Sequence, residues 1–390
     1  MKTRYAVVTD GLWRNSLSAI RSLGKAGFEI TVMGDTWLTT GFWSRFARRR
    51  HRGPLASVDP DAFCGHLEHV LRQCPEKPLL VPMSQTSLLA VAEHQDRFAE
   101  LAWFLFPDLD NLHIAASKRR TMDLAQQLDL PCPVTVASDT IEAFVENALA
   151  FPHAELVLKP TRGLGSHGVK YLLKDDLDAE ELRRHWQAHG PLLIQERVPA
   201  AGEALGASLV MDKDGTCLAC FCHKRLHQYP ITGGPSTNRV SIRHPEIAQM
   251  STRLLRALAW RGVAMVEWKV HPATGRPLLM EINPRFWGSL ELGIRAGVDF
   301  PLLYAKAALG EPVVPVMDYE EGVRCRWMAG DILRYLSQAR TDREGLARFC
   351  RGFFSESEEW DRRDVRGWMA SFLCKGLLVL RPAYWKYLRR

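Results

Sequence analysis

Three side chains in the second half of the chain have types and spacing that suit a metal site: Glu267, Glu281 and Asn283. Glu281 and Asn283 stand two positions apart in a run, Leu278–Arg285, that begins with the apolar composition of a strand. Because side chains alternate between the two faces of a strand, both are expected to point to one face. Their carboxylate and amide oxygens are ligands that hard cations prefer.

A hairpin is expected to bring Glu267 to the same place. The apolar-rich segments 263–270 and 278–282 flank residues 271–277, whose Pro, Thr and Gly content is typical of a turn. A symmetric register then sets Glu267 opposite Glu281, and two carboxylates facing each other across strands repel unless a cation lies between them. Mg²⁺ fits, with Mn²⁺ as an alternative, because Mg²⁺ shares its coordination positions with nucleotide phosphates. The competing interpretation is a pair of solvated glutamates on an exposed sheet face.

A glycine-rich segment upstream is a candidate phosphate loop. Residues 156–160 and 169–173 have strand composition, and Lys159 lies before the glycines that join them. In a dinucleotide fold such glycines open a helix, and in a P-loop the lysine follows them directly. A hairpin that folds over phosphates is therefore the better interpretation, and an ordinary glycine-rich hairpin is the alternative. Backbone amides approach phosphate closely at small residues, here Gly163, Gly165, Ser166 and Gly168.

The next apolar run, 191–198, predicts a buried strand that ends in polar residues, with Glu203 five positions further on. Such a segment suits a hinge between two halves of a domain, with backbone groups offered to a base and Glu203 to ribose hydroxyls. As isolated residues, Glu196 and Glu203 are typical of a surface.

The order of these parts resembles the ATP-grasp superfamily, in particular its carboxylate-amine ligase and carbamoyl-phosphate-synthase-like branch, over residues 1 to 315. The segments Val157–Pro160, Gln195–Val198 and Met280–Arg285 carry the resemblance, together with Glu267. Neither a second grasp module nor a glutaminase or biotinylated segment is evident. Stand-alone ligases of the family are therefore the closer model.

The resemblance implies a role for each candidate residue. ATP and Mg²⁺ are the implied cofactors, and Arg285 is implied to contact the transferring phosphate or the acyl substrate. The other implied contacts are Lys118, Lys159 and the glycine loop to phosphates, Gln195, Glu196 and Val198 to adenine, Glu203 to ribose, and Glu267, Glu281 and Asn283 to Mg²⁺. Arg225 and Arg239 flank a loop with Gly233 and Gly234, and both are candidates to bind an anionic substrate, because arginine matches carboxylates in bidentate geometry.

The predicted fold has three parts. Strand signals at 5–8, 29–33, 79–82 and 103–106 alternate with helix signals such as 16–25, which predicts a parallel α/β domain over residues 1–115. By the resemblance, this is the pre-ATP-grasp domain, and residues 116–315 form an α+β ATP-grasp fold of two subdomains. Residues 316–390 form a C-terminal extension with no recognisable motif.

Composition excludes several other classes. Apolar residues make up 46% of the chain and charged residues 24%, which is typical of globular proteins, and no run of about 18 apolar residues predicts a membrane span. The net charge of +7 and the arginines at 45–52 invite a nucleic-acid interpretation, but a solvated loop that attracts an anionic substrate is favoured.

Nine cysteines without framework spacing suit the cytoplasm. Cys217, Cys220, Cys222 and His223 are interpreted as strand residues rather than a zinc site.

The aromatic and basic residues at 384–390 suit contact with a membrane surface, although a helix docked on its own protein is the more common arrangement.

The predicted function is ATP-dependent joining of a small carboxylate to an amine, through an acyl phosphate. Two alternatives stay open: a kinase that stops at a phosphorylated product, and a nucleotide-binding module without turnover.

Overall fold

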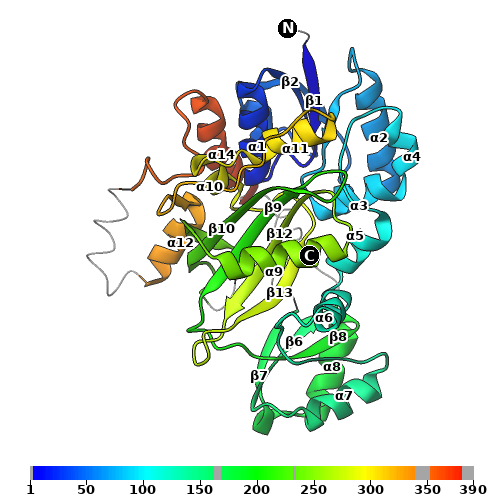
Figure 1. The fold of residues 1–390 in the computed structure, drawn as a ribbon, viewed down its shortest axis with the longest axis vertical. Coiled ribbons are helices and arrows are strands. Elements are labelled where there is room, and N and C mark those ends of the chain that lie inside the picture. The colour runs from blue at the N-terminus through cyan, green and yellow to red at the C-terminus, as the bar shows by residue number, and fades with distance from the viewer. Residues whose placement is uncertain (1–2, 162–167, 232–233, 339–351, 380–390) are drawn as a thin grey trace. The chain divides into compact units, whose positions relative to one another are not determined.

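The computed structural model describes the chain except for residues 1–2, 162–167, 232–233, 339–351 and 380–390 (Figure 1). It divides into two compact units. The larger unit comprises residues 1–112, 207–265 and 283–390, and the smaller unit comprises residues 113–206 and 266–282.

The first sheet of the larger unit is parallel, as the alternating strand and helix signals predict. Its strands are β1 (Arg4–Val8), β2 (Phe28–Gly34), β3 (Ala47–Arg52) and β4 (Leu79–Val81), in the order β3-β2-β1-β4. Helix α1 (Arg14–Lys25) connects β1 to β2 and buries Ile20 and Leu23 in the core of this unit. The remaining elements of this part are η1 (Thr40–Trp43), α2 (Pro60–Arg72), α3 (Gln85–Glu93), α4 (Gln95–Ala99) and α5 (Leu109–Ala116).

Two predictions about this region need correction. Residues 103–106 do not form a strand, since only Trp103 makes an isolated parallel bridge, to Leu79. The arginine cluster is not a loop, because Ala47–Arg52 is the edge strand β3, paired with β2. Backbone pairing does not require apolar side chains, and exposed charges on an edge strand oppose pairing with another chain.

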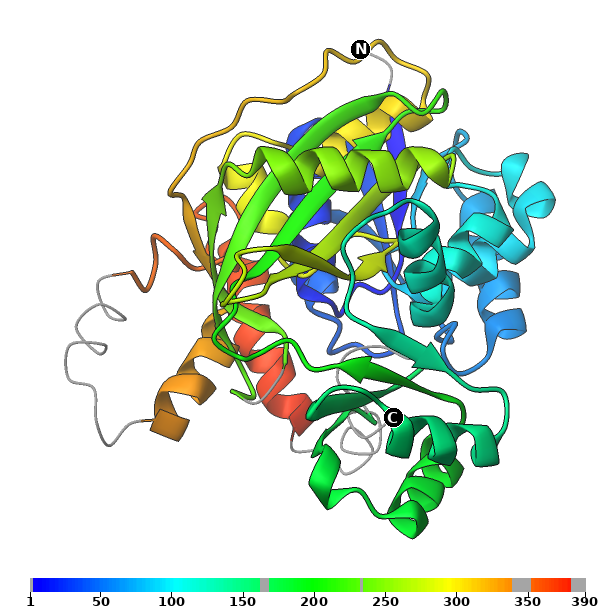
Figure 2. The same cartoon turned by 60° about the horizontal axis from the view of Figure 1, so that its bottom comes forward.

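The main sheet has six strands, in the order β13-β12-β9-β10-β11-β14. Helix α9 (Pro245–Ala257) lies across it, and its buried residues include Ile247 and Leu254 (Figures 1 and 2). The strands are β9 (Ala204–Met211), β10 (Cys217–Gln228), β11 (Ser236–Ile242), β12 (Gly262–Val270), β13 (Pro277–Asn283) and β14 (Arg324–Arg326), and α10 (Leu290–Arg295) and α11 (Phe300–Ala308) follow β13.

The smaller unit is built on an antiparallel sheet of order β5-β8-β6-β7, as the hairpin signals predict. Helices α7 and α8 cover one face and enclose an apolar core that includes Phe144, Leu158 and Ile194 (Figure 1). The elements are α6 (Lys118–Gln127), β5 (Thr135–Ala137), α7 (Ile141–Ala150), β6 (Glu155–Pro160), β7 (Lys170–Leu173), η2 (Lys174–Asp176), α8 (Ala179–His189) and β8 (Leu192–Glu196).

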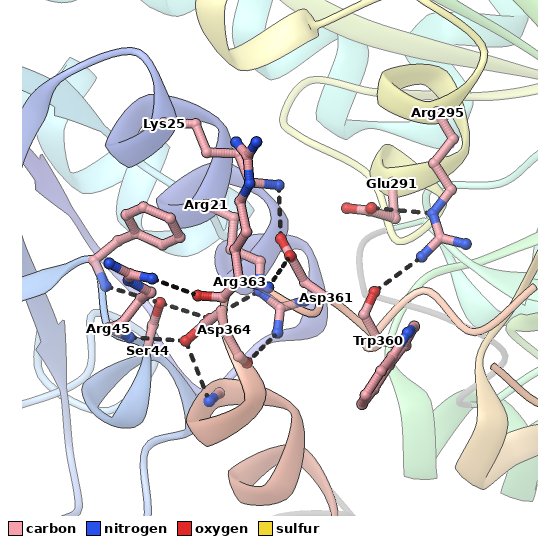
Figure 3. Close-up of polar contacts among 12 residues, drawn as sticks. Arg21, Lys25, Ser44, Arg45, Glu291, Arg295, Trp360, Asp361, Arg363 and Asp364 are labelled. Atoms are coloured by element: carbon pink, nitrogen blue, oxygen red, sulfur yellow. Dashed lines mark hydrogen bonds and ion pairs between the residues drawn. The ribbon is translucent and has the colours of Figure 1, made fainter. Parts of the chain in front are cut away.

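The C-terminal part belongs to the larger unit and contains α12 (Met328–Gln338) and α14 (Val365–Val379). Asp364, at the start of α14, accepts hydrogen bonds from Arg21 Nε, Ser44 Oγ and the Arg45 backbone nitrogen, each at 2.8 Å (Figure 3). Helix α14 therefore docks on the N-terminal part of its own unit. The predicted membrane contact of residues 384–390 lies outside the described residues, and none of the described helices is long and apolar enough to cross a membrane.

Replacing Asp364 by alanine is expected to lower the free energy of unfolding by about 3–5 kcal/mol, because it leaves the buried Arg21 guanidinium without its carboxylate. Urea denaturation measures the change. Asp361→Ala is the matched control: its partner Lys25 is 41% exposed, so the loss should be below about 1 kcal/mol. Equal losses in the two variants would contradict a special role for the Arg21–Asp364 pair.

Candidate active site

Lys159 is the half-buried centre of a polar cluster in the smaller unit. It lies on β6, and its Nζ donates to Gln195 Oε1 on β8 at 2.6 Å. Gln195 is held in turn, since its Nε2 donates to Thr135 Oγ1 on β5 at 2.8 Å. Three strands of one sheet therefore fix the lysine and the glutamine that the sequence predicts for nucleotide binding.

Four further charged side chains act on Lys159. The pKa of Lys159 is lowered to about 8, mainly because burial disfavours its charged form. The ammonium groups of Lys118 and Lys269 contribute to this lowering, whereas the carboxylates of Glu281 and Glu267 oppose it. The predicted residues Lys118, Lys159, Glu267 and Glu281 therefore share one electrostatic environment, although they come from α6, β6, β12 and β13. A site with three ammonium groups and two carboxylates suits a polyphosphate with a divalent cation.

Lys269 joins the cluster around Lys159, although the sequence analysis does not predict it. Its Nζ donates to the backbone oxygen of Val198 at 3.0 Å, within the segment predicted to bind adenine. The spacing in the sequence could have indicated this residue, since Lys269 follows Glu267 by two positions and so shares its face of β12.

The predicted base and ribose segment runs beside the end of β12. The Val270 nitrogen donates to the Glu203 backbone oxygen at 2.8 Å, and a Cβ on Gly202 would lie 2.0 Å from the Val270 oxygen. Only glycine permits this approach of two backbones. The Glu196 carboxylate accepts from the Val134 nitrogen at 3.2 Å, so that side chain fastens β8 to the segment before β5. The adenine and ribose contacts stay predictions.

The segments predicted to contact the phosphates and the substrate are described only in part. Lys118 opens α6, where the Ser117 hydroxyl caps the helix by accepting from the Arg120 nitrogen. Gly168 has a φ of 71° and ends the glycine-rich segment. Gly163, Gly165 and Ser166 lie outside the described residues, as does Gly233.

The β12–β13 hairpin is present, and its turn is closed by a hydrogen bond from the His271 nitrogen to the Arg276 oxygen at 2.9 Å. The direct opposition of Glu267 and Glu281 across it stays a prediction. Both carboxylates are half-buried, whereas Asn283 is buried and its Oδ1 accepts from Arg285 Nη2 at 3.3 Å.

Carboxylate and amide oxygens are donors that Mg²⁺ prefers, so the side chains of Glu267, Glu281 and Asn283 have the chemistry that would hold it. Among the residues that the structure describes, no group of three or more His, Cys, Asp and Glu side chains forms a metal cluster of its own.

Arg285, in the larger unit, is held by the first turn of α1. Its Nη1 donates to the Phe286 oxygen at 2.9 Å, and Asn15 Nδ2 donates to the same oxygen at 3.0 Å. The Trp13 ring centre lies 6.0 Å from the Arg285 guanidinium carbon, within cation–π range. Trp13 and Asn15 were not predicted, because nothing in a lone Trp-Arg-Asn triplet indicates what it contacts.

The two other candidate arginines face each other across β10 and β11, where Arg225 pairs in register with Arg239. Arg225 Nη1 donates to the Gly234 oxygen at 3.4 Å, beside the predicted substrate loop. Arg239 differs from the prediction of a substrate ligand: it is fully buried and forms an ion pair with Glu358.

His223 is buried on β10 beside these arginines. Burial, together with the charges of Arg239 and Arg225, lowers its pKa to about 3. The neighbouring Cys217 and Cys222 are buried on the same strand, as predicted for strand cysteines.

The protein is expected to lose stability as the pH falls from 6.5 towards 3, because the unfolded His223 binds a proton that the folded one does not. This residue contributes at most about 1.4 kcal/mol per pH unit. Urea midpoints at pH 7, 6 and 5 should therefore fall less steeply in His223→Gln than in the wild type. Parallel pH dependences in the two proteins would show that His223 is not held neutral.

Comparison with known proteins adds sequence and structural relatives. Acetyl-CoA carboxylase 1 of Oryza sativa subsp. japonica is 29% identical over 136 residues, covering 33% of this chain and 6% of the relative. The carbamoyl phosphate synthase large chain of Methanobrevibacter smithii is 23% identical over 223 residues, covering 52% of this chain and 21% of the relative. The chain thus spans about a fifth or less of the length of these relatives.

Three solved structures share the fold. The biotin carboxylase domain of Hydrogenobacter thermophilus 2-oxoglutarate carboxylase, in complex with MgADP, has a TM-score of 0.66 at 13% identity, covering 82% of this chain and 73% of that one. N5-carboxyaminoimidazole synthetase from Staphylococcus aureus has a TM-score of 0.66 at 11% identity, covering 87% and 86%. L-amino acid ligase from Bacillus licheniformis has a TM-score of 0.61 at 15% identity, covering 79% and 75%.

The chain shares its fold with these solved structures. Residues 228–330 match the family described as ATP-grasp in the biosynthetic pathway with Ter operon, so this part of the chain is similar to ATP-grasp proteins. That range begins on β10 and includes Asn283 and Arg285.

Proposed function

We propose that the protein is an ATP-dependent ligase that activates a small carboxylate as an acyl phosphate and joins it to an amine. The observation that carries this proposal is the cluster around Lys159, in which three lysines and two glutamates share one site. A site that only held a nucleotide would have less need of a carboxylate pair for a cation. Glu281 and Asn283 lie at the end of β13, and Arg285 follows two residues later. This spacing would allow a cation and an arginine to act on the same transferring phosphate.

In the proposed reaction, a carboxylate oxygen attacks the γ-phosphorus of ATP, the bond to the bridging oxygen breaks, and ADP leaves. The amine nitrogen then attacks the acyl carbon, a C–N bond forms, and inorganic phosphate departs as the amine loses a proton to solvent or phosphate. Phosphoryl transfer needs mainly positioning and neutralisation of charge. Lys118 and Lys159 would hold the phosphates, and Arg285 would stabilise the charge on the transferring group. Mg²⁺, bound by Glu267, Glu281 and Asn283, would neutralise phosphate charge.

The substrates are proposed from charge. Arg225 lies beside the 229–235 loop, and Arg285 follows β13, so an anionic carboxylate is the class that these arginines suit. Two structural neighbours are an L-amino acid ligase and an N5-carboxyaminoimidazole synthetase. The names of both enzymes agree with the proposal that this chain acts on a small molecule. We also propose a cytoplasmic location, the domain limits 1–115, 116–315 and 316–390, and no nucleic-acid partner.

Oxygen-18 tracing tests the acyl phosphate. A carboxylate labelled with ¹⁸O should transfer one labelled oxygen to inorganic phosphate in each turnover. Unlabelled phosphate during amide formation would contradict the proposed intermediate. A stable phosphorylated product without phosphate release would instead establish a kinase.

A further inference from the structure

The C-terminal part of the chain supplies a buried carboxylate that no motif indicates. Glu358 is 4% exposed and lies in a segment tied to the larger unit at several points. Asp364 is anchored by Arg21 and Ser44, and the Trp360 oxygen accepts from Arg295 Nη2 at 3.3 Å (Figure 3). Glu358 is therefore held at a fixed place by contacts on its C-terminal side.

Glu358 joins two arginines from distant parts of the chain. Its Oε1 accepts from Arg14 Nη1 at 2.9 Å, and its Oε2 accepts from Arg239 Nη2. Arg239 is 0% exposed and the Arg14 side chain 16% exposed, so solvent screens this cluster weakly. Burial lowers the pKa of Arg14, and Glu358 opposes that shift. One carboxylate thus keeps two guanidinium groups close together.

Both arginines contact the backbone at Gly288. Arg239 Nη1 donates to the Gly288 oxygen at 3.4 Å. A Cβ on Gly288 would lie 2.5 Å from Arg14 Nη2, so the guanidinium rests against the glycine. The Arg14 guanidinium also lies 4.8 Å from the Trp327 ring centre, which limits its movement on another side.

Gly288 is three residues beyond Arg285, in the loop that follows β13. The same loop is fastened at Phe286, whose oxygen accepts from both Asn15 and Arg285. Arg14 and Asn15 are consecutive residues at the start of α1. The loop that carries Arg285 is therefore held at two points by α1, and Glu358 fixes one of them.

We propose that Glu358 is a positioning residue for Arg285, so that the C-terminal segment completes the site in which the acyl phosphate is handled. This inference rests on the proposed function for its catalytic meaning. Without the carboxylate, Arg14 and Arg239 repel each other in a weakly screened place and turn away from Gly288. The loop 284–288 then loses the second of its two contacts with α1, and Arg285 loses its fixed position.

Glu358→Gln tests the proposal, because it keeps the shape of the side chain and removes only its charge. Hydrogen–deuterium exchange of peptides that cover 284–292 should rise at least about 10-fold, as local opening becomes easier, while peptides covering 155–160 stay unchanged. ADP release with the cognate substrates should fall about 10-fold through kcat, because a displaced loop loses transition-state contacts. The ATP dissociation constant should stay within about twofold, since the residues proposed to contact the adenine, the ribose and the phosphates belong to the smaller unit.

Asp361→Asn is the matched control, because Asp361 lies in the same segment but pairs with the half-exposed Lys25. It should leave both exchange and turnover at wild-type values. If Glu358→Gln does not fold, Glu358→Asp keeps the charge on a side chain one methylene shorter, and it should show the same pattern more weakly.

Unchanged exchange at 284–292 in a folded Glu358 variant would overturn the proposal, and so would raised exchange with full turnover. The exchange measurement needs no substrate. Raised exchange in a protein whose wild type forms no amide would therefore support the positioning of the loop while the proposed ligase function fails.

Discussion

Replacing Glu281 by glutamine is expected to lower the rate of ATP turnover by about 10²–10³-fold while the fold stays intact. The substitution keeps the size of the side chain but removes one of the two carboxylates that act on Lys159. A neutral amide binds a hard cation less strongly than a carboxylate does. The loss should therefore be accompanied by a higher Mg²⁺ concentration at half-maximal rate, measured by titrating MgCl₂ at saturating ATP.

Glu155→Gln is the matched control for this variant. Glu155 also lies on a strand of the smaller unit, but it is exposed and pairs with Arg197 on the surface. It should turn over ATP at the wild-type rate. Full activity of Glu281→Gln, with an unshifted Mg²⁺ dependence, would refute the metal assignment.

Lys159→Met is expected to weaken ATP binding by about 10–100-fold, the effect of losing one or two charge-assisted hydrogen bonds. Methionine fills most of the buried volume but cannot pair with a phosphate. The variant also removes the hydrogen bond that Lys159 makes to Gln195. Isothermal titration calorimetry with a non-hydrolysable ATP analogue and Mg²⁺ measures the change in affinity.

Lys170→Met provides the comparison, since Lys170 lies on β7 of the same sheet and pairs with the exposed Glu181. Its affinity for the analogue should equal that of the wild type. An unchanged dissociation constant in Lys159→Met would remove Lys159 from the nucleotide site.

The fold was predictable where local patterns dominate. Alternating apolar segments predicted the parallel sheet, and the turn composition of 271–277 predicted the β12–β13 hairpin. The arginine strand β3 was missed because its edge pairing depends on the neighbouring β2, which a local reading of Arg48, Arg49 and Arg50 does not reveal. Residues 103–106 have the composition of a strand, but only Trp103 finds a partner.

The candidate nucleotide site could be proposed from the sequence because most of its residues stand in short motifs on strands. Spacing of two along β12 and β13 relates Glu267 to Lys269 and Glu281 to Asn283, and Lys159 precedes its glycine loop. The network around Glu358 was not predictable in this way. It joins Arg14, Arg239 and Glu358 across more than 300 positions of the chain, and each residue taken alone resembles an ordinary surface charge.

Measuring ADP release tests whether the cleavage of ATP is coupled to joining a carboxylate and an amine. Mg-ATP is supplied with pooled carboxylates, with and without pooled amines and amino acids, and the products are identified by mass spectrometry. Coupled ligation predicts that ADP release requires both pools and yields a product whose mass is that of the acid plus the amine minus water. ADP release without a condensed product, with a phosphorylated carboxylate or hydroxyl compound accumulating instead, would contradict it.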